Sequence, residues 1–264
     1  MIAENRRMVV AGNWKMNLGV GETRSYAKTL IELASRKKEL KHALFAGDLE
    51  LILFPPGISI YIAYTELKST SVAIGAQNVH WEPKGAYTGE ISVPMIVEAG
   101  CRYALVGHSE RRHVFGETID MTSKKLAACI EGGVTPMLCI GETETERKQG
   151  LTEKVLFEQF EGAFGNKIVP TGNIYIAYEP VWAIGTGNTA TPDDAESACR
   201  FVREKIAERF DAETSHKARI LYGGSVNPEN AEELLSQNNV DGVLVGGASL
   251  KPDAFLSIAS SAIR

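Results

Sequence analysis

Eight short apolar runs, spaced along the whole chain, are the feature that most constrains the fold. They are rich in Val, Ile, Leu and Ala, and each is continuous instead of alternating between apolar and polar residues. That pattern is typical of parallel strands that are buried on both faces. In chain order the runs read MVVAG, LELILF, SVAIGA, YALVG, TPMLCI, NIYIAY, RILYGG and DGVLVGG.

Helical patterns lie between these runs. The clearest covers residues 191–210, where Thr191 is a good N-cap, Pro192 suits the first helical position, and Ala198 and Val202 begin an apolar stripe. Similar patterns cover residues 22–38, 118–133 and 151–164. Strands that alternate with helices predict either a closed, eight-stranded parallel (β/α)8 barrel or an open doubly wound sheet.

Polar and glycine-rich clusters favour the barrel. The sequences NWK, GHSE, CIGE, EPVWAIGTG, YGGS and VGGAS follow the apolar runs, at the carboxyl ends of the predicted strands, where barrels assemble their active sites. A dinucleotide-binding sheet would need a G-x-G-x-x-G after the first run, and none stands there. Since no Ser- or Pro-rich linker interrupts the pattern, we expect residues 1–264 to form a single barrel domain.

Composition excludes several classes of partner. A net charge of −5 argues against nucleic acid, which binds clustered Lys and Arg. Cys101, Cys129, Cys139 and Cys199 form no C-x-x-C pair and lie in apolar segments, which favours buried thiols over disulfides or a metal site. No run has the length of a signal peptide or a membrane helix. We therefore expect a cytoplasmic protein without a nucleic-acid or membrane partner.

Longer motifs carry a resemblance to a known family. AGNWKMN, VGHSERR, CIGE, YEPVWAIGTG, YGGSV and DGVLVGGASL lie in this order between Ala11 and Leu250, and together they resemble the triosephosphate isomerases. The resemblance implies a TIM barrel that works as a homodimer with neither a metal ion nor an organic cofactor. It also implies interconversion of dihydroxyacetone phosphate and D-glyceraldehyde 3-phosphate, in glycolysis and gluconeogenesis.

Glu179 is the candidate base. It follows an apolar run and precedes Pro180, which places a carboxylate at the barrel mouth, although alone it would as readily be an exposed loop residue. The resemblance makes the following PVWAIGTG a lid, as is established for this family. In that lid the amide of Gly185 would contact phosphate and Ile184 would close against Leu244. Asn188 departs from the family, since many relatives have lysine there.

His108 follows the fourth run and precedes SERR. Ser109 is a favourable N-cap residue and Glu110 adds an acid, so we predict that a helix begins here with free backbone amides near the imidazole. A lone histidine at a strand end is more often structural. In triosephosphate isomerases, however, a neutral histidine is the known electrophile, and the resemblance assigns that role to His108.

Lys15 follows the first run, and its ammonium would neutralise a phosphate and a developing enediolate. A solvated surface lysine and the Schiff-base lysine of a barrel aldolase are the alternatives. The resemblance implies that Asn13 and Lys15 are catalytic, that Trp14 also contacts the substrate, and that Glu110 pairs with Lys15.

Phosphate binding is expected after the last two strands, the usual place in barrels. Glycine amides there bind a dianion without much side-chain charge. We expect Ser225, Gly246 and Gly247 to contribute, with Gly185 added by the resemblance. Ser109, Cys139 and Glu142 are expected to support the site without contacting the substrate.

Residues 77–90, QNVHWEPKGAYTGE, form a longer connection than is usual after a strand. Apolar side chains on such a loop indicate an interface. The resemblance implies that the loop inserts into a partner subunit near its Asn13 and Lys15. The expected interface residues are Met16, Gln77, Asn78, Tyr87, Thr88, Gly89, Glu90 and Arg111.

Two other classes of function remain open. A barrel aldolase would give a reduced covalent adduct at Lys15 when treated with substrate and borohydride. A binding barrel without turnover would keep phosphate affinity and show no isomerase activity.

Overall fold

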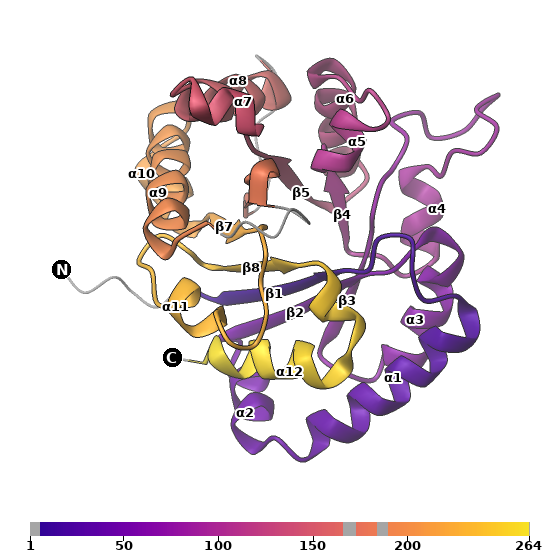
Figure 1. Cartoon of the computed structure of the whole chain (residues 1–264). Helices are drawn as coiled ribbons and strands as arrows, with labels where there is room; N and C mark the ends of the chain where they lie inside the picture. The colour runs from indigo at the N-terminus through magenta and orange to yellow at the C-terminus, as the bar shows by residue number, and fades with distance from the viewer. Residues whose placement is uncertain (1–5, 166–172, 184–189, 264) are drawn as a thin grey trace.

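The chain forms a closed barrel of eight parallel strands that pair in sequence order (Figure 1). The computed structural model describes residues 6–165, 173–183 and 190–263. The strands are β1 (Met8–Asn13), β2 (Leu49–Phe54), β3 (Val72–Ala76), β4 (Tyr103–Val106), β5 (Thr135–Ile140), β6 (Tyr175–Tyr178), β7 (Arg219–Tyr222) and β8 (Gly242–Val245). β1 pairs with β2 and also with β8, where Ala11 faces Leu244. That last pairing closes the sheet, so the predicted TIM barrel is confirmed and the open doubly wound sheet is excluded.

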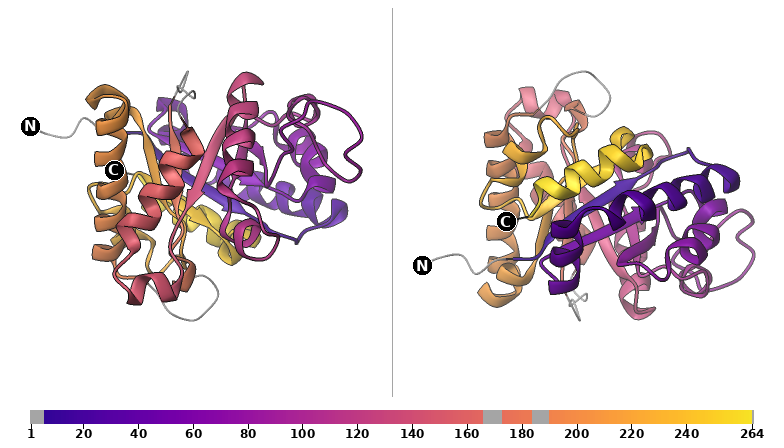
Figure 2. Two further views of the ribbon diagram at one scale, coloured as in Figure 1. Left: turned by 90° about the horizontal axis from the view of Figure 1, so that it is seen from above. Right: turned by 90° about the horizontal axis from the view of Figure 1, so that it is seen from below.

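Helices surround the barrel on its outside (Figure 2). The longer helices are α1 (Val20–Ser35), α6 (Ile119–Glu131), α8 (Thr152–Phe164) and α9 (Pro192–Arg209). The shorter ones are α2 (Lys38–Ala46), α3 (Ile60–Leu67), α4 (Val93–Glu98), α5 (Ser109–His113), α7 (Glu144–Lys148), α10 (Ala212–Lys217), α11 (Ala231–Leu235) and α12 (Pro252–Ser261). Single 3-10 turns are η1 (Gly57–Ser59), η2 (Val181–Ala183) and η3 (Gly247–Leu250).

The four helices predicted from sequence are confirmed, with ends that shift by a few residues. Helix α9 begins as expected, because the Thr191 hydroxyl accepts from Asp194 N and the Asp194 carboxylate accepts from Thr191 N. This capping box fixes where the helix starts.

Two layers of apolar packing explain why the strand sequences are continuous and not alternating. Val9 and Ala11 point into the barrel interior, whereas Val10 between them packs in the layer beneath the helices. Both faces of each strand are therefore buried, as expected for a parallel barrel.

The four cysteines are free and buried, which confirms the prediction of buried thiols. In the parts of the chain that the structure describes, no helix is both long and apolar enough to span a membrane.

Candidate active site

A pocket at the carboxyl ends of the strands brings together residues from five of them. The contributing positions lie at the ends of β1, β4, β6, β7 and β8, or just beyond. The residues that line the pocket are Asn13, Lys15, His108, Glu179, Gly223, Gly224, Leu244 and Gly246. Motifs far apart in the sequence therefore converge at one mouth of the barrel, as the position of the polar clusters predicted.

Glu179 and His108 contact each other at the centre of this pocket. Glu179 Oε1 lies 3.0 Å from His108 Nε2, and Glu179 Oε2 accepts a hydrogen bond from the Ser109 backbone N at 2.9 Å. Glu179 is 2% exposed and His108 is 6% exposed. Oε1 of Glu179 therefore occupies the position next to Nε2, the imidazole nitrogen that faces the pocket.

Glycines make room for Glu179 on two sides. A Cβ atom at Gly141 would lie 1.8 Å from the Glu179 carbonyl oxygen, and one at Gly223 would lie 2.9 Å from Glu179 Cγ. The Glu179 backbone N also donates to Ile140 O at 2.7 Å. Larger side chains at these two positions would displace the carboxylate. Sequence reasoning missed the role of Gly223, although the YGGS motif contains it.

The start of α5 fixes the tautomer of His108. A helix begins at Ser109 as predicted, but the prediction of Ser109 as the N-cap is wrong: His108 is the cap, and its Nδ1 accepts from Glu110 N at 3.2 Å. An imidazole nitrogen has the lone pair that a cap needs, and here it takes the place of the usual hydroxyl or carboxylate. Since Nδ1 accepts, the proton of a neutral imidazole lies on Nε2, the nitrogen that faces the pocket.

The pKa directions of the pair follow from their contact. Burial lowers the pKa of His108, but the Glu179 carboxylate and, to a smaller extent, that of Glu110 raise it, and the net direction is upward. Burial raises the pKa of Glu179, but the imidazole and the Ser109 amide lower it by more. The upward direction at His108 is opposite to the one that the start of a helix alone would give, because a carboxylate lies beside the imidazole.

Lys15 has an unusual backbone. Its φ is +53°, in the left-handed region that residues other than glycine seldom occupy. The Lys15 backbone N donates to Asn13 Oδ1 at 2.9 Å, and the Lys15 carbonyl accepts from Gln77 Nε2 at 2.8 Å. The expected ion pair is present, with Lys15 Nζ 2.7 Å from Glu110 Oε1. Trp14 is 1% exposed and packs edge-on against Tyr26, with ring centroids 4.6 Å apart.

The expected phosphate-binding residues occupy one side of the same mouth. Gly246 lines the pocket, Gly247 begins η3 and is exposed, and Ser225 is exposed just beyond β7. No neighbouring heavy atom of the described chain lies within 4 Å of a Cβ built on Gly247. Open space therefore borders the backbone of Gly247, where the sequence predicts that an anion binds. The expected contributions of Ile184, Gly185 and Asn188 lie outside the described residues.

Two further residues expected to support the site are buried beside it. Burial, together with the neighbouring Glu179 carboxylate, holds the pKa of the Cys139 thiol well above its usual value. Glu142 Oε1 accepts from Trp182 Nε1 at 2.8 Å and from the Tyr178 hydroxyl at 3.1 Å. Glu142 thereby ties η2, which follows Glu179, to the end of β5. Burial raises the pKa of Glu142 above its ordinary value.

The expected interface residues separate into two groups. Met16 is 95% exposed and Tyr87 is 44% exposed, and Thr88, Gly89 and Glu90 are exposed near the tip of the loop between β3 and α4, which extends outward from the barrel (Figure 1). Gln77, Asn78 and Arg111 instead bond to groups within the same chain. Sequence reasoning missed the contacts of Gln77 and Asn78 because their partners, Lys15 and Lys125, lie far away in the chain; the partner of Arg111, Glu117, is only six residues away.

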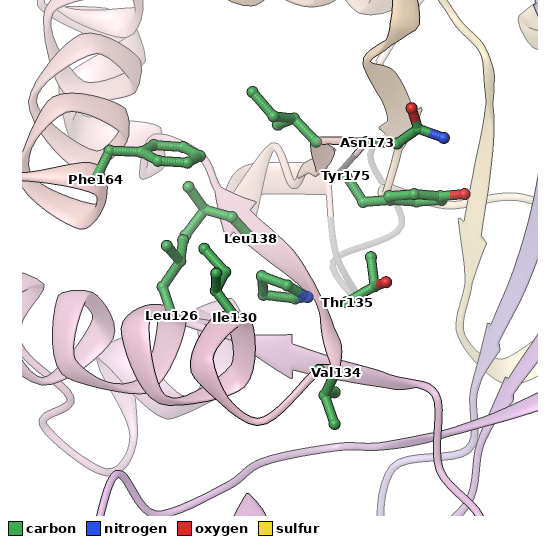
Figure 3. A pocket seen from close by; sticks show the side chains of 11 residues that line it. Leu126, Ile130, Val134, Thr135, Leu138, Phe164, Asn173 and Tyr175 are labelled. Carbon is green, nitrogen blue, oxygen red and sulfur yellow. The ribbon is translucent and has the colours of Figure 1, made fainter. Parts of the chain in front are cut away.

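A second pocket lies at the other end of the barrel, on its outside (Figure 3). Leu126, Ile130 and Phe164 from α6 and α8 face the first residues of β5 and β6 there. Its lining is largely apolar, and the hydroxyl of its one tyrosine, Tyr175, already donates to Glu50 at 2.8 Å. Among the described residues that line this pocket there is no carboxylate, histidine or lysine, whereas the mouth of the barrel brings Glu179, His108 and Lys15 together and is the candidate active site.

Comparisons with known proteins agree with this geometry. A family model described as triosephosphate isomerase matches residues 8–262. A relative of that name from Aquifex aeolicus is 46% identical over 255 residues, which cover 97% of this chain and 99% of the relative. One from Dictyoglomus thermophilum is 47% identical over 257 residues, covering 97% and 100%. One from Carboxydothermus hydrogenoformans is 42% identical over 260 residues, covering 98% and 100%.

Proposed function

The chain belongs to the triosephosphate isomerase family and is an isomerase, and from this premise we propose that it interconverts dihydroxyacetone phosphate and D-glyceraldehyde 3-phosphate through an enediolate. The reaction moves one proton from a carbon next to a carbonyl and returns a proton to the former carbonyl carbon, while a second proton leaves the hydroxyl oxygen and one is added to the former carbonyl oxygen. It needs a base, a hydrogen-bond donor to the substrate oxygens, and a positive charge near the developing negative charge.

We assign these roles to three side chains of the pocket. The Glu179 carboxylate removes the proton from carbon and becomes a carboxylic acid, which then protonates the neighbouring carbon. His108 donates its Nε2 hydrogen to the substrate oxygens, and the Lys15 ammonium stabilises the enediolate and the phosphate. Asn13 hydrogen-bonds the substrate oxygens beside Lys15. We assign phosphate binding to Ser225, Gly246 and Gly247, together with Gly185, which lies outside the described residues. Trp14 is expected to contact the substrate as well.

The observation that carries the proposal is the direct contact between Glu179 and His108. A buried carboxylate lies 3.0 Å from an imidazole nitrogen in a small pocket that Lys15 also lines, so the proposed base, hydrogen-bond donor and cation are close together, which supports the proposal. Lys15 is paired with Glu110 at 2.7 Å. That pairing favours a role in charge neutralisation over the Schiff base of an aldolase.

A coupled isomerase assay on the purified protein tests the proposal. Formation of D-glyceraldehyde 3-phosphate from dihydroxyacetone phosphate, followed through a dehydrogenase, is expected. Phosphate binding without turnover would support a binding barrel instead. A covalent adduct at Lys15 after borohydride treatment with substrate would support an aldolase.

We further propose that the protein works as a homodimer through the loop between β3 and α4. Large apolar side chains are also exposed outside this loop, in the segments that follow β1, β2 and β4: Met16 is 95% exposed, Ile58 75%, Val114 70% and Phe115 65%. Apolar exposure of this extent favours an interface. Sedimentation of the wild type and of Thr88→Arg tests the placement, because an unpaired charge in a buried interface would weaken the dimer strongly. An equally tight dimer of the variant would contradict it.

We place the reaction in the cytoplasm, in glycolysis and gluconeogenesis, and infer that residues 1–264 form one domain. Four free, buried thiols suit a reducing compartment. Fractionation of cells that express a tagged chain tests the location. Recovery of the activity with a membrane or secreted fraction would contradict it.

A further inference from the structure

A buried ion cluster lies behind the loop that follows β3 and takes no part in lining the pocket. It consists of Arg111, Glu117 and Lys125: Glu117 Oε2 lies 3.1 Å from Arg111 Nε and 2.5 Å from Lys125 Nζ. The side chains of Glu117 and Lys125 are 1% and 2% exposed. Because charges are costly to remove from water, a cluster of this kind often serves specificity of structure more than stability.

Lys125 extends from this cluster toward the active site. Its Nζ donates to Asn78 Oδ1 at 2.8 Å. Asn78 directly follows Gln77 at the end of β3, and Gln77 Nε2 donates to the carbonyls of Lys15 at 2.8 Å and Phe54 at 2.9 Å. A continuous series of contacts therefore runs from the buried cluster to the backbone of Lys15.

The Lys15 backbone needs such support. A residue with a side chain keeps φ near +53° only where its surroundings over-determine it, because the left-handed conformation is strained. The Lys15 backbone N donates to Asn13 Oδ1, and the Lys15 carbonyl accepts from Gln77 Nε2, so both sides of the residue are hydrogen-bonded. If the carbonyl side were released, the backbone would relax toward negative φ and the Lys15 side chain would leave the pocket in a new direction.

We propose that Lys125 is a positioning residue for Lys15: acting through Asn78 and Gln77, it holds the Lys15 backbone in the left-handed conformation from which the ammonium enters the pocket. This inference rests on the proposed function for the role of Lys15 toward the substrate phosphate. Burial lowers the pKa of Lys125 and Glu117 raises it, with the net direction downward. The bond to Asn78 needs only an N–H donor, so either protonation state of Lys125 provides it.

Three variants separate positioning from stability. Lys125→Met removes the donor to Asn78 and leaves Glu117 with one cation fewer. Glu117→Gln/Lys125→Met removes the same donor and also removes the uncompensated carboxylate, so its stability should recover toward that of the wild type. Asn78→Ala breaks the contact and leaves the ion cluster intact. Asp241→Asn, in a buried ion cluster at the opposite mouth, is the matched control.

We expect the KM for dihydroxyacetone phosphate and the inhibition constant of inorganic phosphate to rise together, at least about fivefold, in all three variants, the scale of losing a hydrogen bond to a charged group. Asp241→Asn should keep both constants. A loss of folded protein alone would lower kcat and leave KM unchanged. Sedimentation at the assay concentration checks that each variant keeps the oligomeric state of the wild type.

The inference is overturned if KM and the phosphate constant of the double variant and of Asn78→Ala stay within twofold of the wild type. That result would make the cluster purely structural. A wild type without isomerase activity would instead defeat the proposed function. Calorimetric titration with inorganic phosphate would then still compare Lys125→Met with the wild type, so the two failures are distinguishable.

Discussion

The two mouths of the barrel each hold a buried carboxylate, and the partners of these two groups differ in kind. At the amino-terminal mouth, Asp241 bonds to the guanidinium groups of Arg6 and Arg203 and accepts from the Ile220 backbone N at 2.8 Å. At the carboxyl-terminal mouth, Glu179 meets an imidazole and one backbone amide. Permanent cations satisfy the first carboxylate, whereas the second contacts a group whose charge is variable.

This difference shows how one fold separates stability from chemistry. Two guanidinium groups balance the charge of the Asp241 carboxylate within the protein. Glu179 contacts an imidazole and a backbone amide instead, and we expect a substrate oxygen to replace the imidazole contact. In barrels of this kind, residues at the amino-terminal ends of the strands usually serve stability, and residues at the carboxyl-terminal ends serve catalysis. Four substitutions test whether the two mouths behave so differently.

The largest effect is expected at the amino-terminal mouth and concerns stability. Asp241→Asn should lower the free energy of unfolding by about 3 kcal/mol, because it leaves two largely buried guanidinium groups without their counter-charge. Denaturant unfolding measures the loss, and kcat/KM per folded molecule should stay within a few-fold of the wild type. A large fall in kcat/KM of the folded variant would show that the mouths are coupled.

The next effect concerns turnover at the opposite mouth. His108→Gln should lower kcat by roughly 10²-fold or more, the scale of a positioned proton-transfer or donor group. Its unfolding free energy should change far less than that of Asp241→Asn. Steady-state kinetics on the folded variant give the answer, and near-normal turnover would remove His108 from the mechanism.

Glu179→Asp sharpens the comparison by keeping the charge and shortening the side chain. A carboxylate pulled back by about 1 Å should cost about 10²-fold in kcat, since geometry governs the barrier. KM should stay within a few-fold, the pattern of an interaction made in the transition state. In heavy water, deuterium should enter the carbon-bound position of the substrate much more slowly than with the wild type. Unchanged exchange with weaker phosphate binding would make Glu179 a binding residue.

The smallest effect is expected from Tyr175→Phe, again at the amino-terminal mouth. The tyrosine hydroxyl donates to Glu50 Oε2 at 2.8 Å, so its loss should cost about 1.5 kcal/mol of stability and leave kcat unchanged. Chemical denaturation at pH 7 measures this.

The same variant tests a pH dependence. Burial, followed by the Glu50 carboxylate, raises the pKa of Tyr175 to about 12. An unfolded tyrosine loses its proton near pH 10, so the unfolded state deprotonates first and stability falls as pH rises from about 10 to 12. The decline should be shallower in Tyr175→Phe. An equally steep decline in the variant would show that other tyrosines cause the loss of stability at high pH.

The fold was predictable because its signal is local and repeated. Continuous apolar runs such as YALV in β4 and TPMLCI in β5 identify buried parallel strands without knowledge of their partners. Short helices such as α4 and α11 carry too few residues for a periodic pattern. Their positions follow from packing against the barrel, which the sequence does not display.

The candidate site was predictable in part for the same reason. His108, Glu179 and Lys15 stand directly after apolar runs, and parallel strands bring their carboxyl ends together. The prediction of Ser109 as the N-cap of α5 was wrong because hydroxyl groups are more common caps than imidazoles. His108 is the cap through its Nδ1, and this contact depends on the rotamer of the histidine side chain, which the sequence does not show. The contacts of Gln77 and Asn78 with Lys15 and Lys125 join distant segments, so only the folded chain reveals them.

Closure of the sheet by the pairing of β1 with β8 has a consequence for biosynthesis. The pocket takes Asn13 and Lys15 from the first strand and Leu244 and Gly246 from the last. A growing polypeptide that has not yet released β8 from the ribosome leaves two open sheet edges, each able to pair with another chain. Without β8 and the residue after it, the pocket also lacks Leu244 and Gly246, two of the residues that line it. A premature stop codon before β8 should therefore yield an aggregation-prone and inactive product, and not a weakened enzyme.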